Sequence, residues 1–481
     1  MAGLLRKAGV MKFEKEFLIG AATAAHQVEG NNTNSDMWAM EHMKTGSFAE
    51  PSLDAVDQYN RYEEDIKLME QAHLNAYRFS IEWARIEPED GIFDEKEMRH
   101  YMDEIACCKA HGLEPIITLH HFSSPKWLIT KGGWEAQTTP DDFEKYVRYV
   151  ISRIGSEVKY ICTINEANMG LQVASLAKSI MMKMTAKMQQ GAAQAGQQDP
   201  AQSPEHSAQQ FPEHSAQQSP VQSLAQGRSG MQGGSPDGKI QMGINLEQMI
   251  AARQAAGREE NLAVFGVEKL EYFTSMRTPE GDRIIMRAHT QARNAIKELY
   301  PEIRVGLTLS LYDIQACEGG EAFAAKQWDE DFSHYLPYIS EDDFLGVQNY
   351  TRSLMGPEGQ LPNPEGAELT QMEYEFYPEA LENVIRKVSK EFHGDIIVTE
   401  NGIATADDER RVEFIRRALA GVQNCINDKI PVKGYMYWSL IDNFEWQKGY
   451  SMTFGLIGVD RASQKRCPKE SLKYLGSFAG K

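Results

Sequence analysis

The sequence lacks any run of about 18 apolar residues, the length that a membrane-spanning helix requires. Residues 1–17 have a weakly basic start but no apolar core followed by a cleavage site, so they do not predict a secretory signal. Cysteine pairs at metal-binding or redox spacing are also missing, because none of the six cysteines belongs to a CxxC motif. We therefore expect a cytoplasmic protein with reduced thiols and no membrane partner.

Positive charge is scarce relative to negative charge. The chain has 50 Lys and Arg against 69 Asp and Glu, which gives a formal net charge of −19. An acidic surface repels phosphate backbones and anionic headgroups, so we expect neither nucleic acid nor an acidic membrane as a partner. No motif predicts a cofactor or a bound metal, and no pattern indicates the oligomeric state.

The chain does contain a repeated unit, in which a short apolar run is followed by an amphipathic helical stretch. The runs that we expect to be strands are residues 17–23, 75–81, 114–121, 160–166, 303–310, 343–350, 395–401 and 433–440. Buried runs that alternate with helices indicate parallel strands joined by crossovers, and eight strands close a (β/α)₈ barrel. The alternative is an open doubly wound sheet, but the first run leads into "GAATAAHQVEG", which contains no GxGxxG motif. The sequence therefore predicts an α/β fold, with residues 1–481 forming one TIM-barrel domain.

One region departs from this pattern. Residues 189–232 contain 13 Gln and a single aromatic residue, Phe211, and they include "PEHSAQQ" at 204–210 and again at 212–218. Such a composition buries too little apolar surface to offset the entropy that ordering removes. We expect a disordered or flexible insertion after the fourth strand.

Polar and aromatic side chains gather at the C-terminal ends of the expected strands, where barrels of this kind carry their chemistry. The set comprises Gln27, Arg78, His120, His121, Asn165, Glu166, Asn349, Tyr350, Glu400, Trp438, Glu445 and Trp446. Taken singly, each has an ordinary explanation as a loop, packed or core residue. Two carboxylates on different strands, Glu166 and Glu400, suit glycoside hydrolysis, in which one acts as acid and base and the other as nucleophile. Arg78 would keep Glu400 ionised if it points at that carboxylate.

Six motifs in order along the chain resemble glycoside hydrolase family 1, the retaining β-glucosidase and β-galactosidase group. They are "FLIGAATAAHQVEG", "YRFSIEWARIEPEDG", "TLHHFSSPKWL", "TINEAN", "VTENG" and "GYMYWSLIDNFEW". The resemblance covers nearly the whole chain except the Gln-rich segment. It implies a retaining β-glycosidase that acts on terminal β-D-glucosyl residues, with galactosyl or fucosyl residues as alternatives.

The resemblance also implies a role for each site residue. Glu166 would be the acid/base and Glu400 the nucleophile, while Arg78 and Tyr350 would contact the nucleophile. The residues expected to bind the non-reducing sugar are Gln27, His121, Asn165, Trp438, Glu445 and Trp446. Family members that act on phosphorylated sugars lack the glutamate at 445, so the resemblance implies a neutral small-molecule glycoside or oligosaccharide as substrate.

Several positions differ from the usual pattern of the family. Ala167 replaces the proline after the acid/base, Phe122 and Ser123 replace Trp-Asp, and Gln348 stands where an asparagine is common. These differences bear on substrate detail and aglycone preference, and they leave both carboxylates in place.

Three other functions fit parts of the sequence. A transglycosylase would share the same carboxylates, and a carbohydrate-binding pseudoenzyme commonly loses one of them. A metal-dependent hydrolase would need clustered ligands, but His120 and His121 are strand neighbours and are expected to point to opposite faces.

Overall fold

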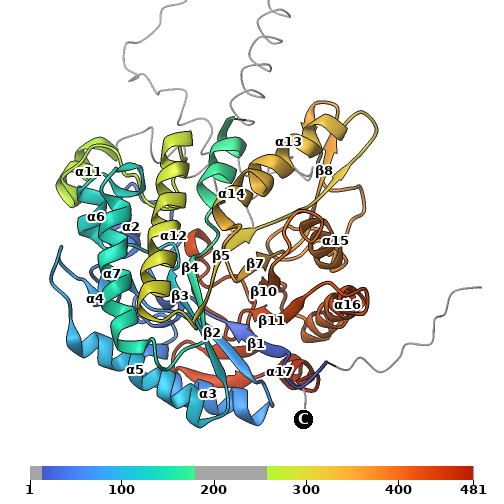
Figure 1. Ribbon diagram of the computed structural model, residues 1–481, viewed down its shortest axis with the longest axis horizontal. Helices are drawn as coiled ribbons and strands as arrows, with labels where there is room; N and C mark the ends of the chain where they lie inside the picture. The colour runs from blue at the N-terminus through green and yellow to red at the C-terminus, as the bar shows by residue number, and fades with distance from the viewer. Residues whose placement is uncertain (1–12, 179–256, 480–481) are drawn as a thin grey trace, which may run out of the picture. The chain divides into compact units, whose positions relative to one another are not determined.

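The computed structural model describes residues 13–178 and 257–479 and contains a closed barrel of eight parallel strands (Figure 1). The strands around the barrel follow the order β1-β11-β10-β7-β5-β4-β3-β2. Their bounds are β1 Leu18–Ala22, β2 Ala76–Ser80, β3 Glu114–His120, β4 Tyr160–Ile164, β5 Arg304–Ser310, β7 Phe344–Gln348, β10 Asp395–Asn401 and β11 Val432–Trp438. Seven of the predicted runs contain one of these strands whole, and the eighth, 433–440, begins one residue after β11 does, so the predicted TIM barrel is confirmed. The predicted insertion, residues 189–232, lies outside the described residues.

The strands are buried because both of their faces are covered. All five residues of β2 and all five of β7 are buried, since the inner face meets the barrel core and the outer face meets helices. The barrel closes where β1 pairs with β11, with Leu18 opposite Gly434 and Ala22 opposite Trp438.

A ring of helices surrounds the barrel (Figure 1). The longer ones are α3 Gln58–Gln71, α5 Glu95–Ala110, α7 Thr139–Ile154, α11 Gly257–Phe265, α12 Pro279–Leu299, α13 Glu321–Asp331, α15 Ala380–Val388, α16 Asp408–Asn427 and α17 Glu470–Gly476. Side-chain caps fix several N-termini: Asp94 accepts from two backbone N–H groups of α5, and Asp407 does the same for α16.

Short elements fill the connections. They are α1 Ala25–Val28, α2 Asp36–Glu41, α4 Trp83–Ile86, α6 Lys126–Thr130 and α14 Leu336–Ile339, with 3₁₀ turns η1 Gly133–Glu135, η2 Ser333–Tyr335 and η3 Trp446–Lys448. Two small sheets were not predicted. One joins β6 Asp313–Ala316, β8 Arg352–Gly356 and β9 Gly359–Gln360, and the other pairs β12 Ile457–Asp460 with β13 Lys465–Pro468.

The β12–β13 hairpin is attached to the N-terminal half of the barrel by a buried ion pair. Arg466 donates to both carboxylate oxygens of Asp65 at 2.8 and 2.9 Å, and both side chains are almost fully buried.

Within the described part of the chain, no helix combines the length and the apolar character that crossing a membrane requires. All six cysteines are free thiols.

Candidate active site

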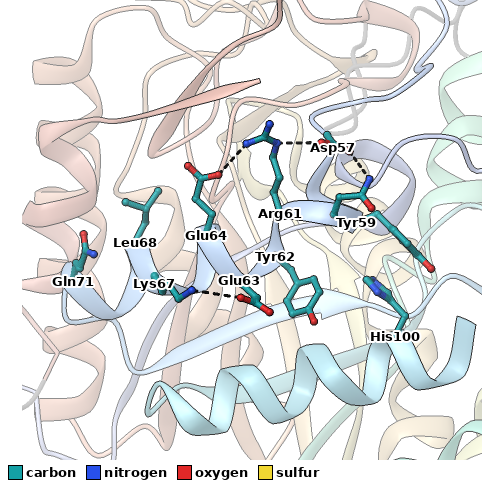
Figure 2. Close-up of a pocket in the computed structure, with 11 residues that line it drawn as sticks. Asp57, Tyr59, Arg61, Tyr62, Glu63, Glu64, Lys67, Leu68, Gln71 and His100 are labelled. Carbon is teal, nitrogen blue, oxygen red and sulfur yellow. Dashed lines mark hydrogen bonds and ion pairs between the residues drawn. The ribbon is translucent and has the colours of Figure 1, made fainter. Parts of the chain in front are cut away.

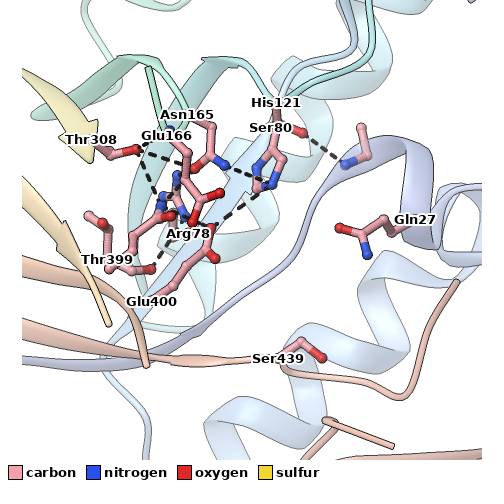
Figure 3. Close-up of polar contacts among 12 residues, drawn as sticks. Gln27, Arg78, Ser80, His121, Asn165, Glu166, Thr308, Thr399, Glu400 and Ser439 are labelled. Carbon is pink, nitrogen blue, oxygen red and sulfur yellow. Dashed lines mark hydrogen bonds and ion pairs between the residues drawn. The ribbon is translucent and has the colours of Figure 1, made fainter. Parts of the chain in front are cut away.

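The carboxyl ends of the barrel strands bring the two predicted carboxylates to one place (Figure 3). Glu400 lies in β10, and Glu166 follows the last residue of β4 by two positions. Their exposed fractions are only 3% and 2%. Both are therefore ionisable groups in a buried site, where their protonation depends on the neighbours that the fold supplies.

Three donors hold the carboxylate of Glu400. Arg78 Nη1 donates to Oε1 at 2.6 Å, Gln348 Nε2 donates to the same oxygen at 3.0 Å, and the Tyr350 hydroxyl donates to Oε2 at 2.6 Å. Burial raises the pKa of Glu400 above its usual value, while Arg78 and Tyr350 act in the opposite direction. The contacts expected for Arg78 and Tyr350 are thus present, and they fix both oxygens of the carboxylate.

Asn165 links the Glu400 cluster to the rest of the site. Its Oδ1 accepts from Arg78 Nη2 at 2.6 Å and from Gln348 Nε2 at 2.7 Å, which directs its amide nitrogen toward His121 Nε2 at 3.1 Å. Thr308, from β5, supports the same region, because its hydroxyl accepts from the backbone N–H of Glu166 at 2.9 Å.

Sequence reasoning did not assign Gln348 and Thr308 to the site. A signal for Gln348 was available, since it precedes Tyr350 by two positions and alternate residues of a strand share a face. No comparable signal marked Thr308, which reaches the site only because β4 and β5 are neighbours in the barrel.

Glu166 lies in surroundings that favour its protonated form. Burial and the adjacent charge of Glu400 raise its pKa well above the usual range of a glutamate. Its backbone adopts a left-handed conformation with φ of 42°, which is uncommon for a residue with a side chain and is frequent at functional sites. The two carboxyl groups therefore differ in environment, as an acid and a nucleophile must.

This electrostatic coupling can be tested directly. In the Glu400→Gln variant the pKa of Glu166 should fall, because the charge that raises it is removed, and burial should keep it above the value of an exposed glutamate. Titration of ¹³C-labelled glutamate carboxyls by NMR measures the shift. Glu445→Gln is the matched control: Glu445 acts on Glu166 in the same direction but contributes less than Glu400, so its removal should lower that pKa less. An unchanged titration of Glu166 in Glu400→Gln would show that the two carboxyls do not interact.

The residues expected to bind sugar line a second side of the site. Gln27 Nε2 donates to the backbone oxygen of Phe444 at 2.8 Å and lies 3.3 Å from Glu445 Oε2. The ring of His121 stacks on Trp438 with centroids 5.7 Å apart and an interplanar angle of 25°. Gln27 Oε1 and His121 Nδ1 are buried and have no hydrogen-bond partner among the described residues.

His120 does not belong to the site. Its ring packs against Trp134 and Phe273 at centroid distances of 4.6 and 4.7 Å, and its Nε2 lies 3.0 Å from the Ser124 hydroxyl. Burial and the charge of Arg277 lower the pKa of His120 to about 3, so it is a neutral packed residue. The two adjacent histidines face different surroundings, as expected from their positions on a strand.

A separate hollow of about 890 Å³ lies along α3 on the outside of the barrel (Figure 2). Its aromatic residues are Tyr59, Tyr62 and His100, and the charged groups around it pair with one another, as Arg61 does with Asp57 and Glu64. None of the strand-end residues lines it. The strand-end cluster is therefore the better candidate for an active site.

Comparisons with known proteins agree with this geometry. Residues 10–184 and 331–481 match the family model described as Glycosyl hydrolase family 1. Beta-glucosidase A of Thermotoga maritima is 27% identical, with 96% of each chain covered, and a 6-phospho-beta-galactosidase of Lacticaseibacillus casei is 28% identical, with 97% of each covered. The crystal structure of beta-glycosidase BGL167 superposes with a TM-score of 0.77 at 39% identity, with 97% of each chain covered.

Proposed function

The chain belongs to glycosyl hydrolase family 1 and is a retaining β-glycosidase, and from this premise we propose that Glu400 is its nucleophile and Glu166 its acid and base. The observation that carries the assignment is the difference between the two carboxyls. Glu400 receives hydrogen bonds from a buried arginine, an amide and a phenol, which favour the ionised form. Glu166 is buried beside that charge and has a raised pKa, which favours the protonated form.

The first half of the reaction cleaves the glycosidic bond. The Glu400 carboxylate attacks the anomeric carbon while the Glu166 carboxyl gives its proton to the departing oxygen, and a covalent glycosyl-enzyme results. Arg78 and Tyr350 hold the attacking oxygens in place, so little reorganisation is needed as the bond forms.

The second half releases the sugar. Once Glu400 is esterified its charge is gone, which removes one cause of the raised pKa of Glu166. Glu166 is then an ionised base that takes a proton from water as the water attacks the anomeric carbon. Two inversions leave the product with the β configuration of the substrate.

We further propose that the substrate is a neutral terminal β-D-glucosyl group, with galactosyl and fucosyl groups as alternatives. Gln27, His121 and Asn165 offer hydrogen-bonding groups for its hydroxyls, and the buried tryptophans Trp438 and Trp446 offer flat apolar faces. A panel of aryl β-glycosides, read by the released phenol, tests the function: rapid turnover of the glucoside supports it, and inactivity across the whole panel contradicts it.

The preference for a neutral sugar depends on Glu445. Burial and the charge of Glu400 raise the pKa of Glu445 to about 8, so its carboxyl is neutral below that pH and repels a sugar phosphate above it. We expect the enzyme to prefer a β-glucoside over its 6-phosphate, and the preference to grow as the pH rises through about 8.

Replacing Glu445 tests whether the charge of its carboxylate causes the preference for the neutral sugar. Glu445→Gln should raise kcat/KM for the 6-phosphate relative to the neutral glucoside by about tenfold at pH 9, since it removes the repelling charge. The ratio in this variant should no longer change across the range in which Glu445 titrates. Kinetics of the wild type that favour the 6-phosphate would contradict the assignment of Glu445.

We propose that residues 1–481 act as one catalytic domain and that the enzyme works in the cytoplasm, where its free thiols stay reduced.

A further inference from the structure

The indole of Trp446 rests on a buried histidine. The ring of His26 is stacked on that of Trp446 with an interplanar angle of 4° and a centroid distance of 5.8 Å, an offset parallel arrangement. We propose that His26, fixed by Glu41, is a positioning residue that sets the plane of Trp446 and thereby the affinity for the terminal sugar. This inference rests on the proposed contact between Trp446 and the sugar.

Hydrogen bonds to both nitrogens fix the orientation of His26. Nε2 lies 2.6 Å from Glu41 Oε1, and both side chains have no exposed surface. Asn32 Nδ2 donates to Nδ1 at 3.0 Å, so the ring carries its proton on Nε2 and donates it to Glu41. The imidazole therefore has one orientation, which its two partners impose.

Glu41 is itself held in place. Its second oxygen, Oε2, accepts from the backbone N–H of Ser52 at 2.8 Å and from the Ser52 hydroxyl at 2.7 Å. A carboxylate that is fully buried and has three donors resists rotation, because any turn leaves a buried polar group without a partner. The support for His26 thus extends from α2 to the segment that precedes α3.

Trp446 needs such support because its own backbone gives it little. It begins η3, a 3₁₀ turn of three residues, and has a left-handed φ of 45°. Besides His26, the indole meets the edge of Phe122 at a centroid distance of 5.4 Å and an interplanar angle of 64°. The imidazole is the parallel surface among these contacts, so it is the group that defines the indole plane.

His26 also links two parts of the sugar site. It precedes Gln27 in α1, a helix of only four residues, and Gln27 donates to the backbone oxygen of Phe444. One short helix therefore presents an amide toward the sugar and an imidazole toward the tryptophan. A shift of His26 would disturb the binding of sugar more than the chemistry at Glu400.

The test compares binding with chemistry. His26→Phe keeps an aromatic ring under Trp446 but removes both hydrogen bonds. We expect KM for 4-nitrophenyl β-glucoside and Ki for phenyl 1-thio-β-glucoside to rise about tenfold, with kcat reduced less than threefold. Glu41→Gln should raise Ki about threefold, because its amide can still accept from Ser52 but no longer provides a charged acceptor for His26.

A double-variant cycle shows whether His26 acts through Trp446. In a Trp446→Phe background the effect of His26→Phe on Ki should disappear, since the indole that it orients is absent. His289→Phe is the matched control: His289 is equally buried and pairs with Asp342 at 3.1 Å, away from the sugar site. It should lower the melting temperature and leave Ki unchanged.

Other results would overturn the inference. If His26→Phe melts earlier but keeps the wild-type Ki, His26 is only structural. If its effect persists unchanged without Trp446, it acts by another route. If Trp446→Phe itself leaves Ki unchanged, the sugar contact assigned to Trp446 fails, whereas catalysis by Glu166 and Glu400 is unaffected. Should His26→Phe not fold, Glu41→Gln is judged by the same criteria.

Discussion

Glu400→Gly is expected to lower kcat by a factor on the order of 10⁵ or more, because no covalent glycosyl-enzyme can form without the nucleophile. The variant leaves a space of carboxylate size beside Arg78, which is fully buried and lies 2.6 Å from the missing oxygen in the wild type. A buried guanidinium without its partner attracts a small anion. Azide should therefore enter this space and restore turnover of a dinitrophenyl β-glucoside.

The product of this rescue identifies the nucleophile. Azide attacks the anomeric carbon from the face that Glu400 occupied, so a single inversion gives an α-glycosyl azide, which NMR distinguishes from the β form. Glu104→Gln is a suitable control, since it removes another buried carboxyl group, in α5, whose partner is Gln58. It should keep wild-type kcat and give no azide product. A β-glycosyl azide from Glu400→Gly would assign the nucleophile elsewhere.

Glu166→Ala is expected to lower kcat by about 10²–10⁴-fold for substrates with poor leaving groups, the usual contribution of a positioned acid. Dinitrophenolate leaves without a proton, so with that substrate the glycosyl-enzyme should still form. It should then accumulate, because water attacks it slowly without a general base. A burst of phenolate in stopped-flow measurements, followed by slow turnover, is the expected result.

Azide also distinguishes the role of Glu166 from that of Glu400. It needs no base, so it should accelerate the second step of Glu166→Ala and give a β-glycosyl azide, the product of two inversions. Wild type provides the comparison, because its base already activates water and azide should add little. If azide helped both proteins equally, or if the variant gave the α product, Glu166 would not be the acid and base.

The barrel could be predicted from the sequence because a strand that is buried on both faces contains a short run of consecutive apolar residues. In "DIIVTEN" three consecutive apolar residues, 396–398, are followed by three polar ones, and this change marks both a strand and the rim of the site. The register in which neighbouring strands pair could not be predicted from the sequence. That Ala22 lies opposite Trp438 depends on the tilt of all eight strands and not on any local pattern.

The reacting groups of the site were predictable, but much of what supports them was not. Glu166 and Glu400 stand out as carboxylates at strand ends. His26 and Glu41 do not, because a histidine and a glutamate 15 positions apart carry no signal of contact until α1 and α2 fold back on each other. The spacing of Gln348 to Tyr350 indicates its face, but not its contacts, since only the closed barrel places its amide between Asn165 and Glu400.

The pairing of β1 with β11 has a consequence for biosynthesis. Roughly 400 residues separate these two strands, and a ribosome adding about 5–20 residues per second needs roughly 20–80 s to make them. Throughout that time the edge of β1 that pairs with β11 in the finished barrel has no neighbour in the nascent chain. An unpaired strand edge is a template for pairing with other polypeptides. Arg466, whose partner Asp65 is made early, is translated later still. The barrel therefore has an open edge until its last strand emerges, and a chain that ended before β11 would leave both β1 and β10 with an unpaired edge.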